Sequence, residues 1–81
     1  MDTRHKIIEA LKELRPDVED FESVELIDSG ILDSFDMVSL IHELAERFDI
    51  EIGIENVLPE NFNTVNSIQS MVERLIGEKG R

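Results

Sequence analysis

Apolar residues recur at helical spacing in three stretches of the chain, and each stretch predicts an amphipathic helix. The first predicted helix runs from about residue 3 to 14 and should end at Arg15-Pro16, because proline disfavours a helical conformation in the residue before it. Its apolar face consists of Ile7, Ile8, Leu11 and Leu14.

The second predicted helix covers about residues 34–49 and the third about residues 64–76. Asp33 is a candidate N-cap of the second helix, and Asp36 falls in its first turn, where the positive helix end favours an acid. Asn63 or Thr64 can cap the third helix. The apolar face of the second helix is Met37, Val38, Ile41, Leu44, Ala45 and Phe48, with Leu40 beside it. That of the third is Val65, Ile68, Met71, Val72, Leu75 and Ile76.

The segments between these helices are of two kinds. Residues 16–33 keep no period and predict a long ordered loop that places scattered apolar side chains in the core. Residues 54–58 predict a single short helix stopped by Pro59, and residues 77–81 a frayed, charged tail. With no period-2 strand pattern, the sequence predicts an all-α fold, a small bundle of three main helices plus one short helix, as one domain over residues 1–81.

Charge narrows the choice of partners. The 81 residues include 19 acids and 8 Lys or Arg, a formal net charge of −11, and Arg47 is the only base between residues 16 and 73. Such a surface either simply solubilises the protein or binds a basic protein partner, and it repels nucleic acid. No apolar run is long enough for membrane insertion, and we expect a cytoplasmic protein.

The residue types that carry most enzyme chemistry are scarce. The chain has no cysteine, and its two histidines, His5 and His42, lack the spacing of a metal site or a partner nucleophile. No glycine-rich nucleotide-binding fingerprint occurs. We therefore expect no catalytic residue, no metal and no enzyme activity.

Ser34 is the one position that suggests chemistry. It follows the long loop and opens the second helix. One interpretation is a plain N-terminal helix serine. The other is an acceptor for a phosphate-linked group, because unpaired N–H groups and the helix dipole favour negative charge there.

A resemblance supports the second interpretation. The run Asp33-Ser34-Phe35, continued by residues 36–40, resembles the Asp-Ser-Leu attachment motif of acyl carrier proteins. Residues 44–52 and 64–68 are similar to later parts of the same family. The resemblance implies that a phosphopantetheinyl transferase esterifies Ser34 with 4′-phosphopantetheine from coenzyme A. It also implies a non-catalytic carrier that holds acyl groups as thioesters.

The resemblance also implies a docking surface around Ser34. Loading and acyl-transferring enzymes with basic patches would meet the motif residue Asp33 and the second helix, and a monomer suits such a shuttle. The implied contacts beyond Asp33 are Phe35, Asp36, Met37, Glu43 and Glu46. Two points stay open. Phe35 is either a docking or a core residue. The apolar residues between the second and third helices either line a cavity for a short acyl chain or fill the core; they are Val38, Ile41, Leu44, Ile54, Leu58, Ile68 and Met71.

The pathway is open as well. Fatty acid, polyketide or specialised lipid synthesis would each use such a carrier. Phe35 replaces the usual leucine, and residues 30–34 are closer to the Gly-x-Leu-Asp-Ser of D-alanyl carrier proteins. A carrier of D-alanine or another aminoacyl group is therefore an alternative. A third, from another class, is an acidic helical interaction module without a prosthetic group.

Overall fold

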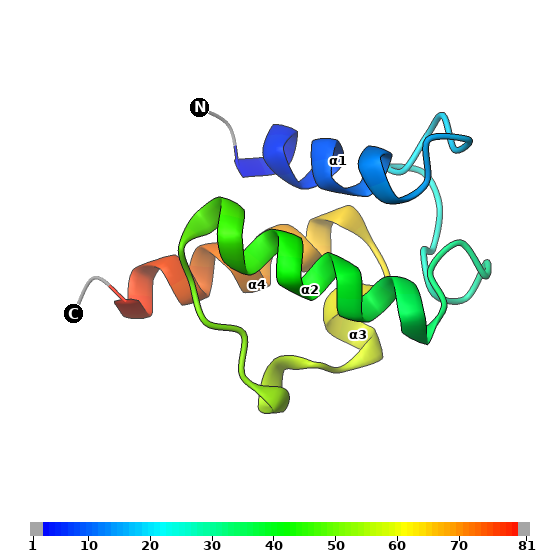
Figure 1. Cartoon of the computed structure of the whole chain (residues 1–81). Helices are drawn as coiled ribbons and strands as arrows, with labels where there is room; N and C mark the ends of the chain where they lie inside the picture. Colours follow the sequence, from blue (N-terminus) through cyan, green and yellow to red (C-terminus); the bar gives the residue numbers. More distant parts are fainter. Residues whose placement is uncertain (1–2, 80–81) are drawn as a thin grey trace.

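The computed structural model describes residues 3–79, and over this range it contains helices and no strand. In chain order the elements are α1 (Thr3–Leu14), α2 (Ser34–Phe48), the 3-10 helix η1 (Ile54–Asn56), α3 (Pro59–Phe62) and α4 (Val65–Lys79). Three long helices with short additions confirm the predicted all-α class. Figure 1 shows α1 on one side of α2 and α4, with the long first loop crossing the end of the bundle where α2 begins.

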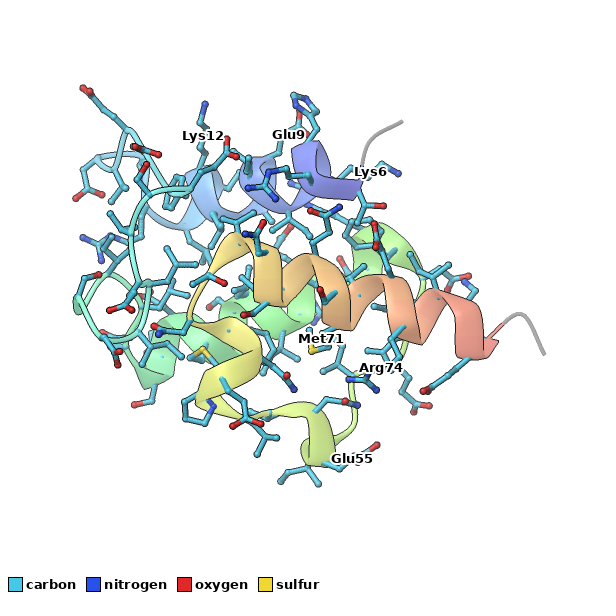
Figure 2. All side chains as sticks on the ribbon, turned by 180° about the vertical axis from the view of Figure 1, so that it is seen from behind. Lys6, Glu9, Lys12, Glu55, Met71 and Arg74 are labelled. Carbon is cyan, nitrogen blue, oxygen red and sulfur yellow. The ribbon has the colours of Figure 1, made fainter. Side chains whose placement is uncertain are left out.

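One apolar core joins the three long helices and the first loop. The helices contribute Ile7, Ala10, Leu11, Leu40, Leu44, Val65, Ile68, Met71, Val72 and Leu75, and the loops contribute Phe21, Leu26, Leu32 and Ile50. Met71, on the inner side of α4, illustrates this burial (Figure 2). The loop before α2 is therefore anchored by its own buried side chains rather than resting on the surface. Leu40, expected beside the apolar face of α2, is fully buried.

Both ends of α2 are fixed by local hydrogen bonds. At the start, Asp33 is the N-cap and forms a reciprocal capping box with Asp36. At the other end, Asp49 adopts the left-handed conformation, with φ 53°, and its N–H donates to the carbonyl of Ala45. The capping box defines where the helix begins, and so it makes Ser34 the first helical residue.

The single helical turn predicted at 54–58 is present but shorter, and the prediction that Pro59 stops it is wrong. The structure has a 3-10 helix at Ile54–Asn56, and Pro59 begins the separate helix α3. Proline suits the first turn of a helix, because its missing N–H would have no intrahelical partner there. Arg74 of α4 points towards η1 (Figure 2), and its Nη2 donates to Oδ1 of the buried Asn56 at 2.8 Å.

The last helix is longer than expected. Residues 77–79 were predicted to fray, but α4 continues through Gly77 to Lys79; residues 80 and 81 of the predicted tail lie outside the described range. Lys79 explains the extension, because its Nζ donates to the carbonyl of Asp49 and lies 3.1 Å from Oδ2 of the same residue. This contact ties the end of α4 to the end of α2. Within residues 3–79 no helix has the length and apolar character needed to cross a membrane.

Candidate functional site

Ser34 lies exposed at the first position of α2. The side chains on either side of it are engaged with the helix backbone: the Asp36 N–H donates to Oδ1 of Asp33 at 2.8 Å, and the Asp33 N–H donates to Oδ2 of Asp36 at 3.4 Å. The two carboxylates therefore cap the helix and leave the serine hydroxyl directed at solvent. The first-turn N–H groups of a helix make this position favourable for an anion.

The turn that leads into Ser34 is closed by backbone hydrogen bonds. The N–H of Leu32 donates to the carbonyl of Leu26 at 2.9 Å, and the N–H of Gly30 donates to that of Ile27 at 3.0 Å. Gly30 has φ of +85°, a conformation that glycine adopts without steric cost. Residues 26–32 thus form a compact turn immediately before the cap of α2.

Asn63 holds the far side of this turn. Its Oδ1 accepts from the N–H groups of Ile27 and Asp28 at 2.9 and 3.1 Å, and its own carbonyl accepts from the N–H of Leu26. Its Nδ2 also donates to the Asp28 carboxylate. The sequence suggested Asn63 only as a possible cap of the last helix. Thr64 caps that helix instead, with its Oγ1 accepting from the N–H of Ser67 at 3.0 Å.

Arg15 holds the near side of the turn, and sequence reasoning assigned it no role in the site. Its Nη1 donates to the carbonyl of Ile31 at 2.5 Å and lies 4.0 Å from the Asp36 carboxylate. Its Nε and Nη2 bond both carboxylate oxygens of Asp17. This paired bond raises the pKa of Arg15 and lowers that of Asp17. Arg15 lies eleven residues before this turn, and no local pattern in the sequence signals the contact.

An apolar groove starts beside Ser34 and runs between α2 and the segment 57–59. It has a volume of about 470 Å³ and is lined by Ile27, Leu32, Asp33, Ser34, Met37, Val38, Ile41, Val57 and Pro59. Phe35 is 81% exposed and Ile54 88% exposed, so neither belongs to the core. Of the residues suggested for an acyl cavity, Leu44, Ile68 and Met71 are buried in the filled core.

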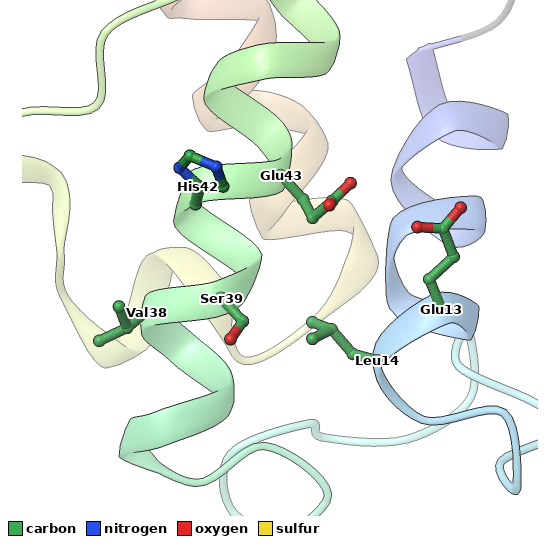
Figure 3. Close-up of a pocket in the computed structure, with 6 residues that line it drawn as sticks. All are labelled: Glu13, Leu14, Val38, Ser39, His42 and Glu43. Atoms are coloured by element: carbon green, nitrogen blue, oxygen red, sulfur yellow. The ribbon is translucent and has the colours of Figure 1, made fainter.

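The opposite side of α2 faces α1 across a second, more polar groove of about 520 Å³. Figure 3 shows Ser39 and Glu43 of α2 pointing towards α1, with Leu14 opposite them. Arg47 bridges the two helices here, bonding Glu43 at 3.0 Å and Glu13 at 2.8 Å. These carboxylates raise the pKa of Arg47.

The predicted docking residues therefore separate into three groups. Phe35 and Glu46 are exposed, and Glu46 pairs only with His42 one turn away, at 3.3 Å. Asp36 and Met37 are half-buried, with Asp36 held in the capping box and Met37 lining the groove beside Ser34. Glu43 faces α1 and is bound by Arg47. Across residues 3–79 no cluster of side chains suits a metal ion.

An acidic three-helix bundle that presents an exposed serine at a helix N-terminus, next to an apolar groove, has the architecture of a carrier domain. Residues 5–75 match the family model described as the phosphopantetheine attachment site. The D-alanyl carrier protein of Streptococcus sanguinis is 40% identical over 76 residues, covering 93% of this chain and 96% of that protein. The D-alanyl carrier protein of Streptococcus uberis is 41% identical over the same shares. The chain belongs to the acyl carrier protein family.

Family membership confirms three expectations. The protein carries 4′-phosphopantetheine, it is a non-catalytic carrier, and it is a substrate of a transferase that attaches this group. The structure fits the group, because it offers a serine hydroxyl that is exposed, lies at the anion-favouring end of a 15-residue helix and adjoins an apolar groove. The family match does not identify which serine carries the group or which acyl group is the cargo.

Proposed function

We propose that this protein is a D-alanyl carrier and that Ser34 is its point of phosphopantetheine attachment. The observation that carries the proposal is the exposed Ser34 hydroxyl at the first residue of α2. The relatives named D-alanyl carrier proteins support the cargo, as does the run from Gly30 to Ser34, which resembles their motif.

The residues of the chain itself prepare the hydroxyl for modification. The capping box between Asp33 and Asp36 fixes the backbone on both sides of Ser34 and leaves its side chain free of the core. The unpaired N–H groups of the first turn favour the negative phosphodiester that esterification creates. When bound, 4′-phosphopantetheine supplies the thiol that this cysteine-free chain lacks, and that thiol holds the cargo as a thioester.

The shape of the space beside Ser34 supports a small cargo. Of the apolar residues suggested for an acyl cavity, Leu44, Ile68 and Met71 are buried in the core, whereas Val38 and Ile41 line the open groove beside Ser34. What remains is a surface groove whose lining contains the Asp33 carboxylate and no basic side chain. An aminoacyl group carries a positive ammonium, which is disfavoured in an apolar interior but accepted beside carboxylates and water.

The arrangement also supports a particular docking surface for the transferase and for the enzyme that loads the amino acid. Phe35 and Glu46 are exposed on α2, while Asp36 and Met37 adjoin Ser34. A partner with a basic rim and an apolar centre would match these side chains, and such contacts favour fast, salt-sensitive association. Glu43 contributes less, because Arg47 neutralises it.

Intact-mass spectrometry tests the attachment site. The unmodified protein is incubated with coenzyme A, Mg²⁺ and a broad-specificity phosphopantetheinyl transferase, and the wild type should gain one phosphopantetheine unit. Ser34→Ala should gain none. Ser39→Ala is the matched control, because Ser39 lies on the same helix but faces α1 (Figure 3), and it should be modified at the wild-type rate.

Other outcomes would overturn the assignment. Modification of Ser34→Ala would place the attachment elsewhere, and a wild type left untouched by several transferases would favour the interaction module. The cargo is tested separately by the intact mass of the protein from its native cell, followed by chiral analysis of the released amino acid. We expect D-alanine. A fatty acyl group would overturn the cargo assignment while leaving the carrier function intact.

A further inference from the structure

Arg15 connects three parts of the molecule that meet next to Ser34. It follows α1, it donates through Nη1 to the carbonyl of Ile31 in the first loop, and the same nitrogen lies 4.0 Å from Oδ2 of Asp36 in the first turn of α2. Ile31 is three residues before Ser34, and Asp36 is two residues after it. The guanidinium thus touches the chain on both sides of the modified residue.

Asp17 fixes the orientation of this guanidinium. The two oxygens of its carboxylate accept from Nε and Nη2 of Arg15 at 3.2 and 3.1 Å. A planar guanidinium held along one edge in this way presents its remaining nitrogen in a set direction. That remaining nitrogen, Nη1, is the one that reaches the Ile31 carbonyl and the Asp36 carboxylate.

We propose that Arg15 is a positioning residue for the phosphopantetheinylation of Ser34. It fixes the position of Ile31 relative to the capping box. The Ser34 hydroxyl is thereby held in the position that the transferase requires. The proposal rests on Ser34 being the attachment site. Arg15 touches neither the hydroxyl nor the incoming group, and therefore acts only through the backbone around Ser34.

The need for such a residue follows from the length of the first loop. Seventeen residues lie between Arg15 and the N-cap of α2, and Asn63 restrains the turn at Ile27 and Asp28 but not at Ile31. Without Arg15, the carbonyl of Ile31 would lose its side-chain donor, and the residues before the cap would be held by the packing of Ile31 and Leu32 and by the backbone bonds of Gly30 and Leu32. Group transfer is sensitive to small misplacements of the reacting atom.

The first test compares transferase kinetics of Arg15→Met with those of Arg4→Met. Both variants remove one positive charge from an α1-associated arginine that contacts the first loop, since Arg4 binds Glu22. For Arg15→Met we expect kcat to fall about tenfold, with little change in KM, because positioning rather than docking is lost. For Arg4→Met we expect kcat within about twofold of wild type. Equal losses in both variants, or no loss in Arg15→Met, would refute the positioning role.

Arg15→Lys separates geometry from charge. A lysine keeps the positive charge near Asp36 but has a single nitrogen, so it cannot bond both oxygens of Asp17 while donating to Ile31. We expect Arg15→Lys to stay nearly as slow as Arg15→Met. A wild-type kcat in Arg15→Lys would show that charge alone matters and would contradict the proposal. If Arg15→Met fails to fold, Asp17→Asn removes the orienting carboxylate and should lower kcat in the same direction.

A second readout needs no transferase. Amide hydrogen exchange in the unmodified protein should be faster in Arg15→Met than in wild type at Leu32 and Asp36, whose N–H groups are bonded within the turn and the cap. Exchange in α4 should be unchanged. Unchanged exchange at Leu32 and Asp36 would overturn the proposal even if Ser34 is the attachment site. A wild type that is never modified would instead overturn the proposed function.

Discussion

The two sides of α2 differ in almost every respect. The side that faces α1 holds the more polar groove, and we call it the closed side because its carboxylates are paired: Arg47 bonds Glu43 and Glu13 across the seam. The side next to Ser34, which we call the open side, carries Phe35, which is 81% exposed, and Val38, which is 67% exposed and lines the apolar groove. A single helix therefore uses its polar residues for internal contacts on one side and leaves apolar residues in water on the other.

This contrast separates stability from function along one helix. Apolar residues exposed at 81% or 67% add little to folding, and their place near Ser34 agrees with the docking surface proposed above. The paired carboxylates of the closed side are poor candidates for docking, because they already have a cationic partner. The role of an acidic residue of α2 therefore depends on which side of the helix it occupies.

The largest expected effect tests the contrast between the core of α2 and its open side. Leu44 is fully buried, so Leu44→Ala should lower the free energy of unfolding by about 3 kcal/mol. Phe35→Ala removes a larger but exposed side chain and should cost about 0.5 kcal/mol or less. Urea unfolding followed by circular dichroism measures both. A similar loss for the two variants would mean that Phe35 packs in the folded protein and that the open side is closed in solution.

Arg47→Met should have the next largest effect, because it leaves three carboxylates of the α1–α2 seam without their cation. The side chain of Arg47 is 23% exposed, so screening by water limits the loss to about 1 kcal/mol of unfolding free energy. Lys12→Met is the control, because it removes the same charge from an exposed position of α1. The Arg47 effect should shrink in high salt; a loss that is independent of salt would indicate packing rather than ion pairing.

The smallest effect concerns docking. Glu46→Lys should raise the KM of phosphopantetheinyl transfer about fivefold at low ionic strength, because an exposed acid of α2 becomes a repelling base. Glu73→Lys makes the same charge change at an exposed position of α4 and should alter KM much less. Moderate salt should remove the difference. Equal KM values for the two variants would remove Glu46 from the interface.

Sequence periodicity was a sufficient guide to the long helices, because their boundaries depend on local chemistry. Pro16 follows the end of α1, and Asp33 caps α2, both readable from neighbouring residues. The predicted helix boundaries are wrong where one residue type is compatible with two local structures. Pro59 can stop or start a helix, and here it starts α3. Gly77 lowers helix propensity, but Lys79 reaches Asp49, thirty residues earlier, and the helix continues.

The candidate site likewise contains residues that the local sequence reveals and residues that it does not. Ser34 was found from the sequence because its motif is contiguous, whereas Arg15 and Asn63 act on the turn from 16 and 35 or 36 residues away. No periodicity encodes such distant pairings. The sequence also could not predict which side chains are exposed. Phe35 and Glu43 lie on one helix, but only the packing of α1 shows that Phe35 is exposed to solvent and that Glu43 pairs with Arg47.

The arginines have a consequence for how copies of the protein behave together. Arg4, Arg15, Arg47 and Arg74 each bind carboxylate groups of their own molecule, and the chain still carries a net charge of −11. Two such molecules repel each other at low ionic strength, and each would be attracted to an enzyme with a basic surface. If the proposed partners have such a surface, a bound carrier would repel a second copy from the same site, and after it dissociates the next would bind quickly.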